Sequence, residues 1–481
     1  MIALGANREM ADIVVIGGGP SGLTAAHEAA AHGASSIVLE RLDRLGGLAR
    51  TVEREGSRWD IGPHRFFTRN PEVRDLFTGI LAADAVRVPR LTRILYENSY
   101  FNYPLTPLNA ITGVGLLSGV SILTSYLQAR LRRLSGAVNI DTFEDWTVDK
   151  FGRRLYETFF KTYTEKVWGI PCAEIGADWA SQRIKGLSLA SAVGNAIFKP
   201  RDNRVKSLID EFMYPRLGTG QLYEKMAADL RLAGHCVSTG VSVKAIVREG
   251  MSVRSLIVAD ATGAREEIAG RFFLSSAPLT EMIAMMQPAA PAEVLAACAR
   301  LRYRHHIGVN LLVSGNPFPD NWIYVHSKDV AMARISNYSN FSKAMTKREG
   351  FSPLTIEYFA FPNDSTWNAA DSELIERATR ELNLKGIVRR DDIADAFVVR
   401  NENAYPVIER GCGSQVSIIK AWLDQFQNLL PIGRSGMFKY NNQDHAMATG
   451  MLAARTALGI RRYDPWLVNI DGEYHESGPS A

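Results

Sequence analysis

The chain of 481 residues has few cysteines and little net charge. Both features exclude several classes of protein. Its 4 cysteines lie far apart without a C-x-x-C pair, which argues against a disulfide framework and a zinc site and predicts reduced thiols with no bound metal. The net charge is +4 and the basic residues are scattered, so we expect no nucleic acid partner. Residues 1–10 lack a continuous apolar segment, so we expect no signal peptide and a cytoplasmic protein.

A clean membrane-spanning run is also missing. Residues 98–129 carry no charge and are followed by Arg130, Arg132 and Arg133. A transmembrane helix needs about 20 predominantly apolar residues, whereas Pro104 and several glycines, serines and threonines interrupt this stretch. We therefore expect a partly exposed helix of a soluble protein, with peripheral membrane contact as the alternative.

The chain does contain a glycine-rich fingerprint near its start. Gly17, Gly19 and Gly22 separate an apolar run from a run of small residues, and Glu40 ends a second apolar run. The order predicts a strand, a tight turn, a helix and a second strand, in which the glycines let a pyrophosphate and the helix approach the backbone. Glu40, about 20 residues further on, is placed to accept a hydrogen bond from a ribose hydroxyl. The fingerprint predicts a dinucleotide site; a plain βαβ turn is the alternative.

The segment after Glu40 favours FAD over a nicotinamide dinucleotide. A nicotinamide enzyme would continue into further βα units, whereas here the pair Gly46 and Gly47 follows the ribose acid. This pattern resembles the FAD-binding superfamily of amine oxidases, protoporphyrinogen oxidases, phytoene desaturases and UDP-galactopyranose mutases. In those proteins the second glycine pair lets the backbone pass close to the FAD pyrophosphate and ribityl chain.

The length of the chain predicts two or three lobes rather than one core. Helical periodicity dominates residues 105–205, whereas residues 303–415 alternate in several β-like runs. The expected fold class is α/β, with a split Rossmann-type FAD-binding domain, a helical insertion and an antiparallel-sheet substrate domain. The predicted segments are 1–85, 206–280 and 426–465 for the FAD-binding domain, 86–205 for the mainly helical insertion, 281–425 for the antiparallel sheet and 466–481 for a C-terminal tail.

Two motifs narrow the resemblance to the UDP-galactopyranose mutases. The D-I-G-P-H run ending at His64 is similar to a mutase segment whose backbone lies against the isoalloxazine, which implies flavin contacts from Gly62 and His64. The K-V-W run ending at Trp168, followed by Arg183, resembles a substrate-domain segment. There Trp168 would line a nucleotide-sugar pocket, and the Arg183 fork would hold a diphosphate oxygen. The alternatives are structural roles: His64 would be held in a turn, Trp168 would belong to the core and Arg183 to the surface.

Two later motifs strengthen the resemblance. The N-A-Y-P-V run around Tyr405 and the G-R-S-G-M-F-K-Y-N-N-Q-D-H run from Gly433 resemble mutase signatures, which makes Tyr405 and Tyr440 diphosphate hydroxyl donors. Between the second and third motifs, the W-I-Y run at Trp322 and the I-S-N-Y-S run around Asn337 stand in the order expected of mutases.

The resemblance implies a role for each of the following residues. We expect FAD contacts from Gly17, Gly19, Ser21, Gly22, Glu40, Arg41, Gly46, Gly47, Leu48, Gly62, His64, Val243, Gly433, Arg434, Asn442, Gln443 and Asp444. We expect catalytic roles for His64, Arg183, Tyr405 and Tyr440. We expect substrate contacts from Trp168, Arg183, Trp322, Tyr324, Asn337, Tyr405 and Tyr440.

The chain departs from the mutase pattern at one position. Mutases carry a second diphosphate-binding arginine on the strand before the S-N-Y-S run, and counting back places Ala331 there. Arg334 lies three residues on, and an odd offset faces the other side of a regular strand. Either a bulge turns Arg334 toward the site, another cation serves, or the substrate is not a nucleotide diphosphate sugar.

The resemblance implies an FAD-dependent isomerase, a sugar-nucleotide pyranose–furanose mutase. Its reduced flavin N5 would act as nucleophile at the sugar anomeric carbon, within cell-surface glycan or glycosylated-metabolite biosynthesis. The expected partners are a nucleotide sugar of open identity, NAD(P)H as an external reductant and a second copy of the chain. The first alternative is an FAD-dependent oxidase or desaturase resembling protoporphyrinogen and amine oxidases. A non-catalytic flavin-binding protein is the second.

Overall fold

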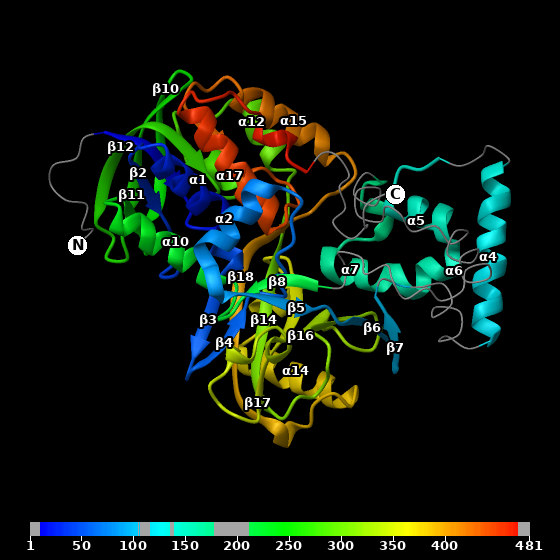
Figure 1. The fold of residues 1–481 in the computed structure, drawn as a ribbon. Coiled ribbons are helices and arrows are strands. Elements are labelled where there is room, and N and C mark those ends of the chain that lie inside the picture. The colour runs from blue at the N-terminus through cyan, green and yellow to red at the C-terminus, as the bar shows by residue number, and fades with distance from the viewer. Residues whose placement is uncertain (1–9, 104, 106–115, 135–138, 178–210, 470–481) are drawn as a thin grey trace.

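The protein, represented by a computed structural model, combines two sheets with a helical lobe (Figure 1). The structure describes residues 10–103, 105, 116–134, 139–177 and 211–469. Its mixed α/β architecture, with a Rossmann-type domain and a second domain rich in sheet, confirms the predicted fold class.

The first sheet forms the core of the Rossmann-type domain. Its central strand β1 (Ala11–Ile16) is parallel to β12 (Arg265–Ser275) on one side and to β2 (Ser36–Leu39) on the other. The strand order is β13-β10-β11-β12-β1-β2-β9, and β19 also pairs with β12. The remaining strands are β9 (Cys236–Ser238), β10 (Ser242–Glu249), β11 (Ser252–Ala259), β13 (Met286–Gln287) and β19 (Leu429–Pro431).

Two helices lie together across this sheet (Figure 1). Helix α1 (Pro20–Ala31) begins at the glycine turn, and α17 (Gln443–Ala457) comes from the other end of the chain. They pack so closely that a Cβ atom added at Gly450 would stand 2.0 Å from the Ser21 carbonyl oxygen. The first and last described parts of the Rossmann-type domain therefore meet in one core.

The second sheet has the order β18-β14-β17-β16-β15-β6-β7. All of its pairs are antiparallel except β6 with β15, which is parallel. Its strands are β6 (Thr92–Tyr96), β7 (Ser99–Asn102), β14 (Tyr303–Ser314), β15 (Trp322–Val325), β16 (Arg334–Asn337), β17 (Phe351–Ala360) and β18 (Ile393–Pro406).

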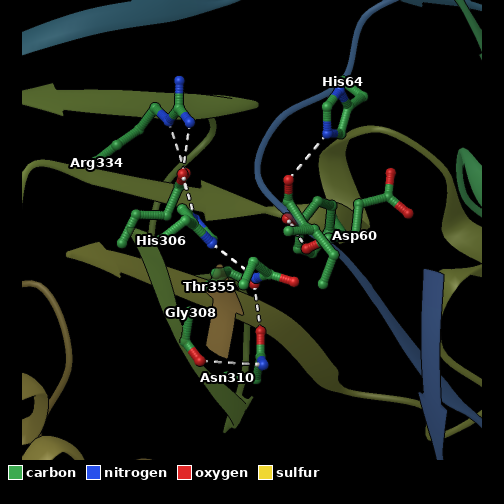
Figure 2. A network of polar contacts seen from close by, with 11 residues as sticks. Asp60, His64, His306, Gly308, Asn310, Arg334 and Thr355 are labelled. Atoms are coloured by element: carbon green, nitrogen blue, oxygen red, sulfur yellow. Dashed lines mark hydrogen bonds and ion pairs between the residues drawn. The ribbon is translucent and has the colours of Figure 1, made fainter. Parts of the chain in front are cut away.

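The two faces of the second sheet differ in character. Along β14, Ile307, Val309 and Leu311 are buried in a core that includes side chains of α14 (Asp371–Leu384). Successive residues of a strand point to opposite faces, so His306 faces the other way. On that face lies the polar network shown in Figure 2.

The helical lobe forms the edge of the molecule opposite the Rossmann-type domain (Figure 1). Its helices are α4 (Leu116–Leu134), α5 (Phe143–Phe151), α6 (Arg153–Tyr156) and α7 (Thr162–Trp168), with a π-helical turn at Glu157–Lys161 between the last two. Within the described part of the chain, no helix is both long and apolar enough to cross a membrane.

The helical insertion expected over 86–205 begins with strands rather than helices. β5 (Ala85–Pro89) pairs with β8 (Glu211–Pro215), and β6 and β7 join the second sheet. The partner of β6 is β15, which lies more than 200 residues later, so no local pattern reveals this pairing. The other elements are β3 (Thr51–Arg54), β4 (Ser57–Asp60), α2 (Pro71–Leu81), α10 (Gly220–Leu232), α11 (Leu279–Ala284), α12 (Ala292–Cys298), α13 (Ser365–Asn368), α15 (Cys412–Leu423) and α16 (Gly433–Gly436).

Candidate functional site

A cavity of about 790 Å³ opens where β1 and β2 end. This volume falls within the range of about 300–1,000 Å³ typical of small-molecule and cofactor sites. Twelve of the residues expected to contact FAD line it: Gly17, Gly19, Ser21, Glu40, Arg41, Gly47, Leu48, His64, Val243, Arg434, Asn442 and Gln443. The other five lie outside the lining: Gly22, Gly46, Gly62, Gly433 and Asp444.

Two glycine turns form one wall of the cavity. Gly17 has φ +102°, and a Cβ atom there would stand 2.1 Å from Ser276 Oγ. A Cβ atom at Gly47 would stand 3.3 Å from the Cα atom of Gly19, so the two turns face each other across bare backbone. Among the residues that the structure describes, no side chain caps the start of α1, which leaves its first N–H groups free to face the cavity.

Glu40 stands at the end of β2 as a buried, fixed acceptor. Its Oε2 accepts a hydrogen bond from the Gly18 N–H at 2.7 Å, and its Oε1 accepts one from the Leu42 N–H at 2.9 Å. A carboxylate oxygen has room for further donors. The geometry is compatible with the expected ribose contact.

A further part of the lining comes from the segment that leads into α17. Arg434 Nε donates to the Asn441 carbonyl oxygen at 2.8 Å. The Asn441 Nδ2 group is buried without a hydrogen-bond partner within the described part of the chain. Buried polar groups are normally paired, so this amide points to a polar ligand in the cavity. Together with the glycine turns and the uncapped helix start, it fits a flavin adenine dinucleotide.

An aromatic cluster adjoins the cavity. Trp168 ends α7, Tyr405 lies near the end of β18, and Tyr440 follows α16. Ring centroids are 5.6 Å apart for Trp168–Tyr440 and for Tyr405–Tyr440, and 6.3 Å apart for Trp168–Tyr405. The Arg434 guanidinium lies 5.1 Å from the Tyr405 centroid and 4.7 Å from that of Tyr440. Arg434 therefore borders both the cavity and the aromatic cluster.

Two further tyrosines extend this cluster, and sequence reasoning missed one of them. Tyr324 contacts Tyr163 with ring centroids 5.3 Å apart, and Tyr163 stacks on His326 at 4.8 Å. Burial raises the pKa of Tyr163, although Arg334 opposes the shift. Tyr163 stands five residues before Trp168, a spacing that does not set two side chains on one face of a helix, so the sequence held no local signal for its role.

Two predicted substrate residues lie in packed surroundings instead. Trp322 is 3% exposed and packs with Phe212 and Phe341. The Asn337 Nδ2 group donates to Asn316 Oδ1 at 2.7 Å. Arg183 lies outside the described residues.

The structure shows which of the alternatives for Arg334 its backbone follows. Ala331 is in the loop before β16, where its N–H donates to Glu381 Oε1 at 2.9 Å, and the strand begins only at Arg334. The same loop is held from the other side by Lys166, whose Nζ donates to the Ser327 carbonyl oxygen at 2.7 Å. Because this loop is irregular, the alternation of side chains along a regular strand does not apply between Ala331 and Arg334, and it cannot predict which way the Arg334 side chain points.

Arg334 forms a two-pronged ion pair with Glu357. Its Nε donates to Glu357 Oε1 at 2.6 Å and its Nη2 to Oε2 at 2.5 Å. Burial alone would raise the pKa of Glu357, but the charge and hydrogen bonds of Arg334, with a further bond from His306, hold this pKa at about 2. A Cβ atom at Gly62 would stand 3.1 Å from Glu357 Oε2, so the G-P-H segment lies directly on this pair.

His64 is neutral at pH 7. Burial and the Arg434 guanidinium lower its pKa to about 4. Its Nε2 hydrogen-bonds the Ile61 carbonyl oxygen at 2.9 Å (Figure 2). A carbonyl only accepts, so Nε2 carries the proton and Nδ1 remains an acceptor.

Known proteins resemble this chain in sequence over limited stretches. A family model described as NAD(P)-binding Rossmann-like domain matches residues 15–80. The probable UDP-galactopyranose mutase of Klebsiella pneumoniae is 27% identical over 173 residues, 34% of this chain and 43% of the relative. Coproporphyrinogen III oxidase of Mycobacterium tuberculosis (strain ATCC 25618 / H37Rv) is 27% identical over 172 residues, 34% of this chain and 38% of the relative. The chain thus matches less than half the length of these curated relatives.

The likeness in fold extends over nearly the whole chain. A crystal structure of reduced UDP-galactopyranose mutase matches it with a TM-score of 0.83 at 21% identity, over 97% of each chain. In sequence the chain is thus similar, over limited stretches, both to a mutase and to an oxidase. Its fold matches that of UDP-galactopyranose mutase.

Proposed function

We propose that the protein is an FAD-dependent sugar-nucleotide mutase that interconverts pyranose and furanose rings without net redox change. One observation carries this proposal: the rings of Tyr405 and Tyr440 lie against Arg434, which also borders the cofactor cavity, and Trp168 packs on both tyrosines. Two phenol groups and a guanidinium are suited to a diphosphate, because charge-assisted hydrogen bonds hold phosphate oxygens firmly.

The residues of the chain would divide the work as follows. Arg434, Tyr405 and Tyr440 would bind the diphosphate and stabilise the negative charge that develops on it as it leaves the sugar. Trp168 and Tyr163 would exclude water from the sugar and hold it in position. His64, neutral and fixed by Ile61, would act as an acceptor through Nδ1. Bound FAD, in its reduced form, would supply flavin N5 as the nucleophile toward the anomeric carbon.

Reduction of the flavin would require an external electron donor, and we propose NAD(P)H for this role. We further propose a cytoplasmic location, a role in cell-surface glycan or glycosylated-metabolite synthesis, and association with a second copy of the chain. Similarity to an oxidase of the same superfamily favours a second candidate, an FAD-dependent oxidase. In that case the tyrosines would line a pocket for a different substrate.

The test uses purified, dithionite-reduced protein with UDP-galactopyranose and, in parallel, other nucleotide sugars. Chromatography should detect the furanose isomer with reduced protein only, and oxidised protein is the control. Tyr405→Phe should weaken UDP binding about 10- to 100-fold, because a hydrogen bond to a charged group contributes about 1.5–3 kcal/mol.

A matched control is Tyr100→Phe, which changes a tyrosine that is 39% exposed. Its UDP affinity should equal that of the wild type. If no nucleoside diphosphate binds the wild type, the proposal that the substrate is a nucleotide sugar is wrong.

A further inference from the structure

A continuous chain of hydrogen bonds runs beneath the G-P-H segment, from the cofactor cavity to Arg334. At the cavity end, Arg50 donates through Nη1 to the Gly47 carbonyl oxygen at 2.8 Å and through Nη2 to Asn401 Oδ1 at 2.5 Å. Asn401 Nδ2 then meets His306 Nδ1 at 3.0 Å, and His306 Nε2 meets Glu357 Oε2 at 2.9 Å (Figure 2). The ion pair of Glu357 with Arg334 completes the chain.

The pairing of the strands places the residues of this hydrogen-bond network opposite one another. His306 of β14 stands opposite Asn401 of β18, and Arg334 of β16 stands opposite Glu357 of β17. Side chains paired across neighbouring strands lie within reach of each other. Glu357 is fully buried, His306 is 2% exposed and Asn401 is 5% exposed. These three side chains have little access to water, so water cannot easily replace a hydrogen-bond partner that a mutation removes.

The two arginines at the ends fix the direction of every hydrogen bond between them. Arg334 has only donors, so Glu357 accepts, and the ionised carboxylate also accepts from His306 Nε2–H. Arg50 has only donors as well, so Asn401 presents its oxygen to Arg50 and its amide N–H to His306 Nδ1. All links are satisfied only by neutral His306 with its proton on Nε2. If His306 also carried a proton on Nδ1, that N–H would face the N–H of the Asn401 amide, and two donors would meet. Rotating the Asn401 amide by 180° would remove this clash but would bring its N–H against the N–H of Arg50.

We propose that Glu357, His306 and Asn401 are positioning residues that bind the cofactor side and the substrate side of the site into one rigid unit. Through Arg50 they fix the Gly47 turn against the dinucleotide, and through Glu357 they fix the direction of Arg334. Glu357 offsets the charge of Arg334, so the pair exerts no general attraction for anions. Tyr163 and Tyr405 lie near enough to Arg334 for its charge to oppose the rise in pKa that burial causes in both. This inference relies on the proposed function only in taking a diphosphate as the substrate-side ligand.

The experiment compares His306→Phe with His306→Gln in the full-length protein. Phenylalanine keeps a ring but supplies neither donor nor acceptor, whereas glutamine supplies one of each. Two affinities are measured for each variant: FAD binding to the apoprotein by fluorescence titration, and UDP binding to the FAD-loaded protein by calorimetry. We expect His306→Phe to weaken both about tenfold, since unpaired buried groups remain at both ends, and His306→Gln to restore both to within about threefold of wild type.

His305→Phe is the matched control for stability. His305 is the neighbouring residue on β14, points to the opposite face, and accepts one hydrogen bond from the Asn403 N–H at 2.9 Å. It should lower the thermal midpoint about as much as His306→Phe while leaving UDP affinity unchanged. If His306→Phe does not fold, Asn401→Leu takes its place and should weaken UDP binding, although Asn401 lies on the cofactor side.

Two results would overturn the proposal. One is unchanged FAD and UDP affinity in His306→Phe, or in its substitute. The other is equal loss in the phenylalanine and glutamine variants, which would mean that His306 only fills space. Failure of UDP to bind the wild type would instead count against the proposed function, and the FAD titration would still decide whether the chain of hydrogen bonds positions the cofactor turn.

Discussion

The two halves of the candidate site are built in different ways. The cofactor cavity is built around backbone groups, the glycine turns and the first N–H groups of α1, and side chains such as Glu40 and Arg434 complete its lining. The substrate side is formed by side chains that come from α7, β16, β17 and β18, far apart in the sequence. Backbone geometry tolerates almost no added atom, whereas a network of side chains depends on the pairing of charges and donors. The two halves should therefore fail in different ways when they are mutated.

The largest effect is expected where the backbone is most crowded. A Cβ atom at Gly22 would stand 1.9 Å from the Gly17 carbonyl oxygen, so Gly22→Val must push α1 away from the glycine turn. We expect loss of FAD binding, measured by flavin absorbance after purification. Gly79→Ala on α2 is the control, because a Cβ atom there meets nothing within 4 Å and alanine favours helix. Retention of FAD by Gly22→Val would contradict the close approach.

The next effect concerns charge pairing on the substrate side. Glu357→Gln leaves Arg334 buried without its counter-ion, which should reduce the free energy of unfolding by about 3–5 kcal/mol. The double variant Glu357→Gln with Arg334→Met should recover much of this loss, because the unpaired charge is then removed as well. Urea denaturation measures all three proteins. A double variant no better than Glu357→Gln would show that packing, not charge, dominates here.

The same carboxylate predicts a dependence of stability on acid. The pKa of Glu357 is about 2 in the folded protein against 4.5 for an ordinary glutamate. The folded-state pKa is depressed, so this contribution is complete above about pH 4.5 and disappears as the pH falls toward 2. In denaturation series over this window, the stability gap between wild type and Glu357→Gln should shrink as acid is added. A constant gap would exclude Glu357 as its source.

A smaller effect is expected from Glu40, one of the side chains that line the cofactor cavity. Glu40→Ala should weaken FAD binding by about 1.5–3 kcal/mol, the contribution of a charge-assisted hydrogen bond. Titration of the apoprotein at limiting FAD measures it, with Glu266→Ala near the start of β12 as the control. Equal FAD occupancy in Glu40→Ala and wild type would exclude the ribose contact.

The cofactor half could be predicted from sequence because its signals are local. The glycines, the helix start and Glu40 lie within one continuous βαβ segment, where spacing alone fixes geometry. Trp168, Tyr405 and Tyr440 were found only through resemblance, because they converge from distant elements. The direction of Arg334 could not be derived from spacing, because the residues before β16 form an irregular loop. Glu357, His306 and Asn401 carry no local motif at all.

The strands at the start of the predicted helical insertion illustrate the same limit. β6 is short, and its neighbours in the sheet are β7 and the distant β15. A strand of 5 residues beside a tight turn gives little periodicity, so its membership in the second sheet follows from tertiary pairing rather than from its own sequence.

The central claim is that the site performs redox-neutral chemistry on a nucleotide sugar. The most direct measurement follows flavin absorbance under anaerobic conditions while UDP-galactopyranose is added to the protein. We predict no bleaching of oxidised flavin by the substrate, and furanose formation with the flavin remaining reduced once dithionite has been supplied. Bleaching of oxidised flavin by substrate, with stoichiometric consumption of oxygen on re-aeration, would contradict the account and make the protein an oxidase.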